Sequence, residues 1–204
     1  MKNEPITKED KVREEILNSA QKLFQQYGLR KTAMEDIAKR SGRGKSTLYY
    51  YYASKEEIFD EVIRREAHEV FSETQKAIAE SPSAEGKLEA YFFTSIKMVQ
   101  EKVNLYNIVR NEFVDDNITR VRVLIKKMNL DDIETVKAIL QLGIDNNEFM
   151  PEIQKEIDLI AYIIVSATRS ILIDLAIDTP VPGWDLRSKL LVSLFIKGFK
   201  TTTV

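Results

Sequence analysis

The scarcity of helix-breaking residues is the feature that most limits how this chain can fold. Only seven glycines and five prolines occur in 204 residues, and these two residue types are the strongest interruptions of regular structure. Between them, apolar side chains recur at spacings of three and four residues, the period of an amphipathic helix, and no stretch shows the sustained alternation of a strand. The sequence therefore predicts an all-α protein of about nine helices.

The first two helices are predicted near the N-terminus. Residues 8–27 place seven apolar side chains on one helical face, and Gly28 follows as a stop. Thr32 and Glu35 fit the S/T-x-x-E capping box, so a short second helix is expected to begin there and to end at Gly42.

Later helices follow from similar punctuation. Ser54 and Glu57 form another capping box, which opens a long helix through about Ile78, and "SPSAEG" at 81–86 is the clearest break in the chain. Further helical segments follow, with a loop at "DNNEFMPE", a long apolar helix at 155–178 and a final helix at 185–199.

Composition excludes several kinds of chemistry. The chain has no cysteine, which removes disulfides and thiolate metal sites, and its single histidine, His68, cannot build a histidine zinc site and makes a Ser-His-Asp triad hard to form. We expect no metal, no cofactor and no enzymatic activity. The polar N-terminus lacks the apolar core of a signal peptide, so a cytoplasmic protein is expected.

The apolar stretch 159–177 has about the length of a membrane span. Arg169 and Asp174 lie within it, and charges there are costly in lipid. A helix that is apolar nearly all round is also typical of a protein interior, and we favour that interpretation over a membrane helix.

Charge is distributed unevenly along the chain. Residues 1–53 carry 11 basic and 7 acidic side chains, a net charge of +4, whereas residues 54–204 carry 19 basic and 25 acidic side chains, a net charge of −6. A basic unit on an acidic body suggests an anionic partner for the first part. Random variation of surface charge explains the difference equally well by itself.

The segment "GKST" at 44–47 matches the end of a nucleotide-binding phosphate loop. The full pattern, G-x-x-x-x-G-K-[ST], requires a glycine at residue 39, where the chain has Lys39, and it requires a preceding strand. The preceding segment is instead a capped helix. A nucleotide-binding enzyme is therefore kept only as an alternative interpretation. A second alternative is a helical interaction module without specific DNA sites.

The same region has the layout of a helix-turn-helix, whose second helix enters the major groove of DNA. Helical spacing sorts the tyrosine run on that second helix, 45–52, into two faces. Tyr51 and Tyr52 join Leu48 on the inward face, whereas Tyr49 and Tyr50 point outward. The alternative is that all four tyrosines are packing residues.

The segment "TAMEDIAKRSGRGKSTLYYYYASKEEIF" strongly resembles the DNA-binding region of TetR-type transcriptional repressors. That family shows T-T/S-x-x-x-I-A, then G-V-S-K-G-T-L-Y-x-Y-F, then S/N-K-E, and the resemblance covers about residues 11–60. The matching positions are Thr32, Ile37, Ala38, Gly42, Lys45, Thr47, Leu48, Tyr49, Tyr51, Ser54, Lys55 and Glu56. The departures are Ala33 for Thr or Ser, Arg43 for a small apolar residue and Tyr52 for Phe.

The resemblance implies a three-helix helix-turn-helix domain at 1–53 and a helical effector-binding and dimerisation domain at 54–204. It further implies DNA contacts from the matching positions, and Arg43 in the turn is expected to add one more. The expected residues are Thr32, Arg43, Lys45, Ser46, Thr47, Tyr49, Tyr50 and Lys55. The expected function is that of a repressor, released from a palindromic operator when a small molecule binds the C-terminal domain.

Two further sets of residues are expected in that second domain. Aromatic, methionine and arginine side chains within apolar helices are candidates for a small-molecule pocket, although such a stripe is equally typical of a core: Tyr91, Phe92, Met98, Tyr106, Arg110, Phe113, Met128 and Arg169. DNA readers of this type use two half-sites, so a homodimer is expected through the final helices. The candidates for its interface are Ile160, Ile164, Ala167, Ile171, Leu191, Leu194, Phe195 and Gly198.

Overall fold

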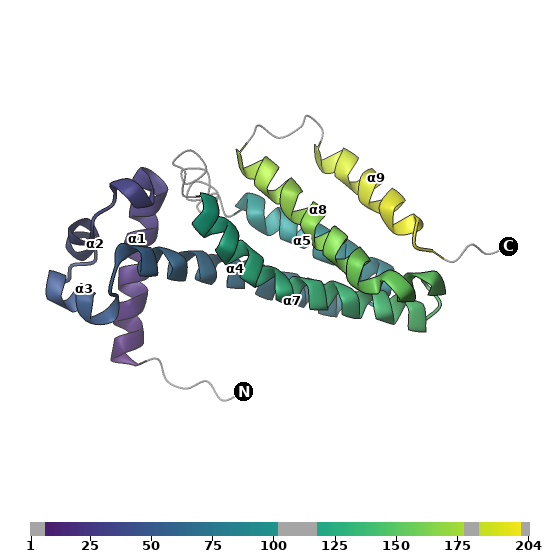
Figure 1. Cartoon of the computed structure of the whole chain (residues 1–204), viewed down its shortest axis with the longest axis horizontal. Coiled ribbons are helices and arrows are strands. Elements are labelled where there is room, and N and C mark those ends of the chain that lie inside the picture. The colour runs from purple at the N-terminus through teal and green to yellow at the C-terminus, as the bar shows by residue number, and fades with distance from the viewer. Residues whose placement is uncertain (1–6, 102–117, 178–183, 201–204) are drawn as a thin grey trace. The chain divides into compact units, whose positions relative to one another are not determined.

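A computed structural model of the chain describes residues 7–101, 118–177 and 184–200 (Figure 1). Within these ranges it contains eight α-helices, one 3-10 helix and a single isolated β-bridge, which confirms the all-α prediction. The elements are α1 (Lys8–Lys31), α2 (Met34–Arg40), α3 (Lys45–Tyr51), α4 (Lys55–Glu80), α5 (Ala84–Glu101), α7 (Ile118–Asp145), the 3-10 helix η1 (Pro151–Glu156), α8 (Ile157–Ile177) and α9 (Trp184–Lys197).

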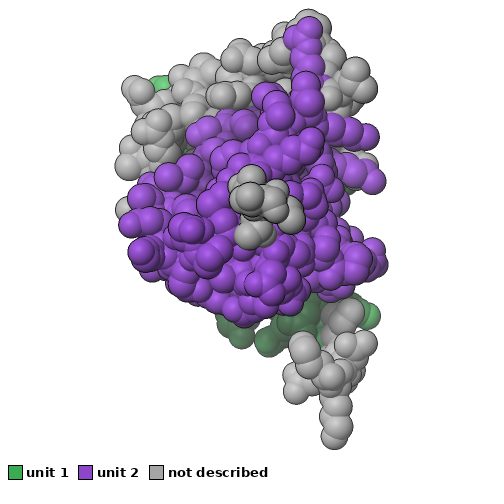
Figure 2. Space-filling model, turned by 90° about the vertical axis from the view of Figure 1, so that its right-hand side faces the viewer, with its two compact units in different colours: residues 1–66, 103–124 green, residues 67–102, 125–204 purple. Residues whose placement is uncertain are grey.

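The chain forms two compact units, which Figure 2 distinguishes by colour. Unit 1 consists of residues 1–66 and 103–124, and unit 2 of residues 67–102 and 125–204. The division at 66/67 falls within the continuous helix α4, so this helix contributes residues to both units. A functional division after residue 53 stays a prediction.

Helix α1 extends further than the sequence predicts. Gly28 adopts a left-handed backbone conformation, with φ 75°, but three more helical residues follow it, so the glycine bends the helix and does not end it. At the N-terminus, Thr7 and Asp10 form a reciprocal capping box: the Asp10 N–H donates to Thr7 Oγ1 over 3.1 Å, and the Thr7 N–H donates to Asp10 Oδ2 over 2.9 Å.

The capping box predicted from Thr32 and Glu35 is wrong by one residue. Helix α2 begins at Met34, and its first turn is capped by Asp36, whose Oδ2 accepts from the Ala33 N–H over 3.0 Å. Thr32 is buried, and its hydroxyl donates to the Gly28 carbonyl over 2.8 Å. The threonine thus satisfies a carbonyl at the bend of α1, which leaves the capping of α2 to the neighbouring residues.

The core of unit 1 joins α1, α2, α3 and the first part of α4. Phe24 of α1 and Phe59 of α4 are fully buried and meet edge to face, with ring centroids 5.3 Å apart. Ile37 of α2 and Leu48 of α3 are also fully buried, so the helix-turn-helix packs its apolar side onto α1 and α4. This packing leaves the opposite side of α3 available to solvent.

The core of unit 2 is closed by the loop that follows α7. Phe149 lies directly over Gly143, where any side chain would collide with its ring, and its N–H donates to the Gly143 carbonyl over 3.0 Å. The neighbouring Glu148 accepts from the first N–H groups of α5, at Ala84 (3.1 Å) and Glu85 (3.2 Å). The loop predicted at "DNNEFMPE" is confirmed for residues 146–150, because Asp145 is the last residue of α7 and η1 begins at Pro151.

The apolar stretch 159–177 forms most of α8, which buries one side in the core of unit 2 and exposes the other. Across the described ranges, none of the helices combines the length and the apolar character needed to cross a membrane.

Candidate DNA-binding site

The turn between α2 and α3 is fixed by a glycine-dependent helix end. Gly42 has φ 66°, its N–H donates to the Lys39 carbonyl over 3.3 Å, and the Arg43 N–H reaches back to the Ala38 carbonyl over 2.9 Å. This pair of bonds is a Schellman motif, which ends a helix and reverses the chain within a few residues. The prediction that Gly42 ends the helix is confirmed, and α3 begins at Lys45.

The four tyrosines at 49–52 divide by helical angle. Tyr50 is 75% exposed and Tyr49 47% exposed, whereas Tyr52 is 2% exposed and packs in the core. Tyr51 is half-buried, so the expectation of an inward ring holds only in part for this residue. Its ring meets that of Tyr50 edge to face, with centroids 5.0 Å apart.

Arg13 of α1 explains the intermediate position of Tyr51. Its guanidinium lies 5.4 Å from the ring centroids of both Tyr51 and Tyr52, within the range of a cation–π interaction. Burial raises the pKa of the Tyr52 phenol, so this side chain stays neutral. The sequence gives no local indication of this contact, because Arg13 lies far from α3 in the chain.

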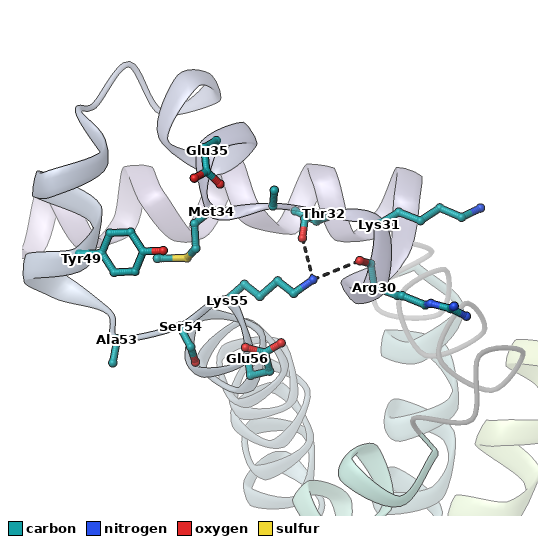
Figure 3. Close-up of a pocket in the computed structure, with 11 residues that line it drawn as sticks. Arg30, Lys31, Thr32, Met34, Glu35, Tyr49, Ala53, Ser54, Lys55 and Glu56 are labelled. Carbon is teal, nitrogen blue, oxygen red and sulfur yellow. Dashed lines mark hydrogen bonds between the residues drawn. The ribbon is translucent and has the colours of Figure 1, made fainter.

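A cleft of about 400 Å³ lies between the end of α1, the start of α2, α3 and the start of α4 (Figure 3). Three residues expected to contact DNA phosphates, Thr32, Tyr49 and Lys55, line this cleft together. Arg30 and Lys31 add two more cations to its lining. The structure therefore brings together side chains that are far apart in the sequence, such as Thr32 and Lys55, which are separated by 23 positions.

Lys55 is engaged within unit 1. Its ammonium donates to the carbonyls of Leu29 (2.9 Å), Arg30 (3.1 Å) and Thr32 (2.9 Å), two of which are drawn as dashed lines in Figure 3. An ammonium has three N–H donors, so these bonds use all of them. Lys55 therefore fixes the end of α1 against the start of α4, and its expected phosphate contact would require these bonds to break.

The remaining expected contacts lie on α3 and on the turn before it. Lys45 and Ser46 are exposed, and Arg43 and Thr47 are half-buried. The Lys45 ammonium lies 5.9 Å from the centroid of the Tyr49 ring. Cations, hydroxyls and flat rings on one surface are the groups that contact phosphates and base edges.

Two acids contact these cations: Glu35, which the sequence analysis used only as a helix cap, and Glu15, which it did not single out. Glu35 of α2 pairs with Lys45, and Glu15 of α1 pairs with Arg43. The hydrogen bond with Lys45 lowers the pKa of Glu35, and the same bond raises the pKa of Lys45. Each ion pair joins residues of different structural elements, so local sequence patterns do not reveal them.

Comparison with known proteins places this site in a family. Residues 16–62 match the family described as bacterial regulatory proteins, tetR family. The chain is 30% identical over 151 residues to YfiR of Bacillus subtilis (strain 168), named as an uncharacterized HTH-type transcriptional regulator, with 72% of this chain and 73% of that protein covered. The chain belongs to the TetR family. It is a DNA-binding transcriptional regulator, as the resemblance implied.

Other relatives agree with this assignment. The chain is 26% identical over 145 residues to the HTH-type transcriptional repressor KstR2 of Rhodococcus jostii (strain RHA1), with 71% of both proteins covered. The crystal structure of FadR from Bacillus subtilis in complex with stearoyl-CoA has a TM-score of 0.67 at 17% identity, over 90% of this chain and 95% of that one. The latter likeness shows a shared TetR-family fold.

The residues expected to bind a small molecule in this TetR-family regulator divide into two groups. Tyr91 is buried, and Phe92, Met98 and Arg169 are half-buried in unit 2. Tyr106, Arg110 and Phe113 lie outside the described residues, as does the side chain of Met128.

A polar cluster in unit 2 consists of Tyr91, Arg169 and Asp132 of α7, whose charges influence one another. Tyr91 is buried, and the other two residues are half-buried. Burial raises the pKa of Tyr91, and Asp132 adds to that effect while Arg169 opposes it. Burial likewise raises the pKa of Asp132, to about 6, although Arg169 opposes the shift. Asp132 precedes the buried Val136 by one helical turn, so the apolar periodicity of α7 marks an inward position that the sequence analysis did not use.

The residues expected at the dimer interface also divide. Ile164 is buried in the core of unit 2, and Ile160 packs against that core, so these two residues face the interior of their own protomer. Ile171 is half-buried. The others lie on the exposed side of α8 and α9: Ala167, Leu191, Leu194, Phe195 and Gly198. Exposed apolar side chains of the same two helices join them: Leu159, Tyr162, Ile163 and Leu190.

Proposed function

We propose that this regulator is a repressor that binds a palindromic operator as a homodimer and is released when a small molecule binds the C-terminal domain. The observation that carries the proposal is the two-sided character of α3. This helix packs Leu48 against the other helices of unit 1 while Lys45 and Tyr50 lie exposed on its other side. A short helix of this kind, after a tight turn, suits insertion into the major groove.

In this proposal, the contacts with DNA have two kinds of chemistry. Arg43 and Lys45 supply positive charge for phosphates or for acceptor atoms of guanine, and the hydroxyls of Ser46 and Thr47 bond to phosphates or base edges. The phenol of Tyr50 donates to the backbone. Thr32 and Lys55 act mainly by holding the ends of α1 and α4, because both side chains already bond to carbonyls of unit 1.

The homodimer is proposed to form through the exposed side of α8 and α9. Leu190, Leu191 and Leu194 are all more than half exposed, and they extend along one helix together with Phe195. An apolar area of this kind is typical of a protein–protein interface. A symmetric dimer would present two copies of α3 to half-sites about one helical turn, roughly 34–36 Å, apart.

The effector is proposed to bind in unit 2 beside Tyr91 and Arg169, with Phe92 and Met98 supplying apolar surface. A guanidinium within an apolar helical body favours an effector that has an apolar body and an anionic group. Stearoyl-CoA, present in the FadR complex, is a molecule of that general kind. The effector shifts the equilibrium only by its differential affinity for the two states of the protein, and the continuous helix α4 offers a path for the change.

Selection of DNA from a random pool tests the proposed function. We expect the full-length protein to enrich a palindrome whose half-sites are separated by about one turn of DNA. The Lys45→Ala variant should enrich the same site poorly, whereas Lys76→Ala, which removes the same charge from an exposed position of α4, should behave as the unmodified protein does. Enrichment of no sequence would favour the interaction module, and nucleotide binding that is lost in Lys45→Ala would favour the phosphate-loop enzyme.

The relatives that match are named as transcriptional regulators, and we propose that this chain acts by binding rather than by catalysis. Since its proposed target is bacterial DNA, we place its site of action in the cytoplasm.

A further inference from the structure

Two cations at the start of α3 form ion pairs with acids of other helices. Arg43, in the turn, pairs with Glu15 of α1, and Lys45, the first residue of α3, pairs with Glu35 of α2. The segment from 37 to 55 contains no acid of its own. The fold therefore supplies each cation with a carboxylate that its own segment lacks.

We propose that Glu15 and Glu35 are built-in competitors of DNA phosphate, which weaken binding to DNA of unrelated sequence. The inference rests on the proposed role of Arg43 and Lys45 in DNA binding. It assigns a role in specificity to two residues that need not touch DNA themselves.

The physical reason lies in the origin of non-specific affinity. Binding to DNA of any sequence is driven almost entirely by cations that neutralise phosphates and release condensed counterions. A lysine that leaves a carboxylate of its own protein to bind a phosphate loses one ion pair as it forms another. It therefore contributes less binding free energy than an unpaired lysine would. Operator binding also draws on the contacts that Ser46 and Thr47 are proposed to make with base edges, and neither residue belongs to these ion pairs.

The exposure of the pairs allows this competition. The side chains of Lys45 and Glu35 are each 57% exposed, and those of Arg43 and Glu15 are 35% and 53% exposed. Ion pairs at such positions are weak, so an arriving phosphate can displace the carboxylate. A buried pair would instead lock the cation away from DNA.

The position of Glu35 also links it to the phosphate-binding side of the site. Glu35 and Tyr49 line the same cleft (Figure 3), and the Lys45 ammonium lies 5.9 Å from the Tyr49 ring. A lysine freed from Glu35 therefore stays beside Tyr49, at the surface proposed to meet DNA. Its charge is then fully available to phosphates.

The test is a salt titration of DNA binding by full-length protein with Glu35→Gln or Glu15→Gln. With a fluorescent duplex of random sequence, we expect each substitution to tighten binding by about three- to tenfold at low salt. The slope of log K against log salt should become steeper by up to about one unit. In the unmodified protein the displaced carboxylate takes up a cation, which offsets one counterion released from the DNA. Glu14→Gln is the matched control, because it removes the same charge from an exposed neighbouring position of α1.

Several outcomes would overturn the inference. Equal effects of Glu35→Gln and Glu14→Gln would reduce the role of Glu35 to general charge repulsion. Weaker binding by Glu35→Gln would mean that the carboxylate instead positions Lys45 for DNA. Failure of the unmodified protein to bind either an operator or random DNA would overturn the proposed function itself. If the unmodified protein binds DNA and the glutamine variants bind with the same affinity, only the role of Glu15 and Glu35 is overturned.

A double-mutant cycle tests whether Glu35 acts through Lys45. In a Lys45→Ala background the gain from Glu35→Gln should disappear, whereas the gain from Glu15→Gln, which acts on Arg43, should persist. An undiminished gain from Glu35→Gln in that background would contradict the assigned pairing. Thermal melting of each variant checks that differences in DNA affinity do not reflect loss of the fold.

Discussion

Helices α3 and α9 both expose large apolar or aromatic side chains, but their surroundings differ. On α3, the exposed Tyr49 and Tyr50 lie among Lys45, Ser46 and Thr47. On α9, the exposed leucines lie at neighbouring helical positions, and α8 exposes further apolar residues. The first surface suits a polar, negatively charged partner, and the second suits another apolar protein surface. The exposure of a side chain thus does not identify its partner, whereas the chemistry of the neighbouring side chains does.

Acidic side chains of unit 1 and unit 2 also differ in their surroundings. Glu35 is exposed at the surface proposed to bind DNA, where its hydrogen bond with Lys45 lowers its pKa. Asp132 is half-buried in unit 2, where burial raises its pKa to about 6. The Glu35 carboxylate, which is proposed to give up Lys45 to a DNA phosphate, lies at the surface. A charge within an apolar body destabilises the fold unless an opposite charge or a hydrogen bond compensates for it.

The largest effect is expected from the double substitution Leu191→Glu/Leu194→Glu on α9. Placing carboxylates in an apolar interface costs several kcal/mol for each ion, so the dimer should weaken by about 4 kcal/mol or more, roughly a thousandfold. Sedimentation equilibrium measures the change. Leu130→Glu on α7, at a leucine that is 65% exposed, is the control and should remain dimeric. A dimer that survives the double substitution would place the interface elsewhere.

The next largest effect is expected within the tyrosine run. Tyr52→Ala removes a buried ring and should lower the free energy of unfolding by about 3–5 kcal/mol, as measured by urea denaturation. Tyr52→Phe keeps the ring and should retain most of that stability. Tyr50→Ala, at an exposed position, should change it by less than about 0.5 kcal/mol. Equal losses at the two positions would remove the division into inward and outward faces.

A pH-dependent effect is expected at Asp132. Its pKa rises from 3.8 to about 6 on folding, so the unfolded chain releases the proton first and stability falls as pH rises through that interval. Asp132→Asn should therefore increase stability by on the order of 1–3 kcal/mol at about pH 7.5, and should have little effect below about pH 4. Melting curves at both pH values measure this difference. Asp131→Asn, at an exposed neighbour, is the control.

A loss of stability in Asp132→Asn at about pH 7.5 would contradict this assignment. It would mean that attraction between the carboxylate and Arg169 outweighs the burial penalty. The polar cluster in unit 2 would then be a structural ion pair rather than a site whose positive charge is available to an effector.

The smallest effect is expected for DNA binding by Tyr50→Ala. Loss of one exposed phenol that contacts the DNA backbone should weaken operator binding by about tenfold, or roughly 1.4 kcal/mol, with an unchanged melting temperature. Fluorescence anisotropy measures the affinity. Tyr27→Ala, at a 48% exposed tyrosine of α1, is the control. Equal weakening in both variants would indicate that α3 is not the surface that meets DNA.

The local elements follow well from the sequence. Helical periodicity predicted the all-α class, the packing of Leu48 and Tyr52, and the exposure of Tyr49 and Tyr50, because these features depend on residues within one or two turns. Gly42 could be assigned to the end of α2 for the same reason. The errors at Gly28 and Thr32 arose where a more distant requirement, a carbonyl freed by a bend, decided the conformation.

What the sequence by itself determined is the order of helices, the helix-turn-helix and the family. Only the tertiary structure decided the partners of its charged groups: Lys55 bonds to carbonyls near the end of α1, and Arg43 pairs with an acid 28 positions away. Helical periodicity results from backbone bonds between near neighbours, whereas these contacts exist only after helices pack together. The surface expected to bind DNA could therefore be read from the chain, but the carboxylates that restrain it could not.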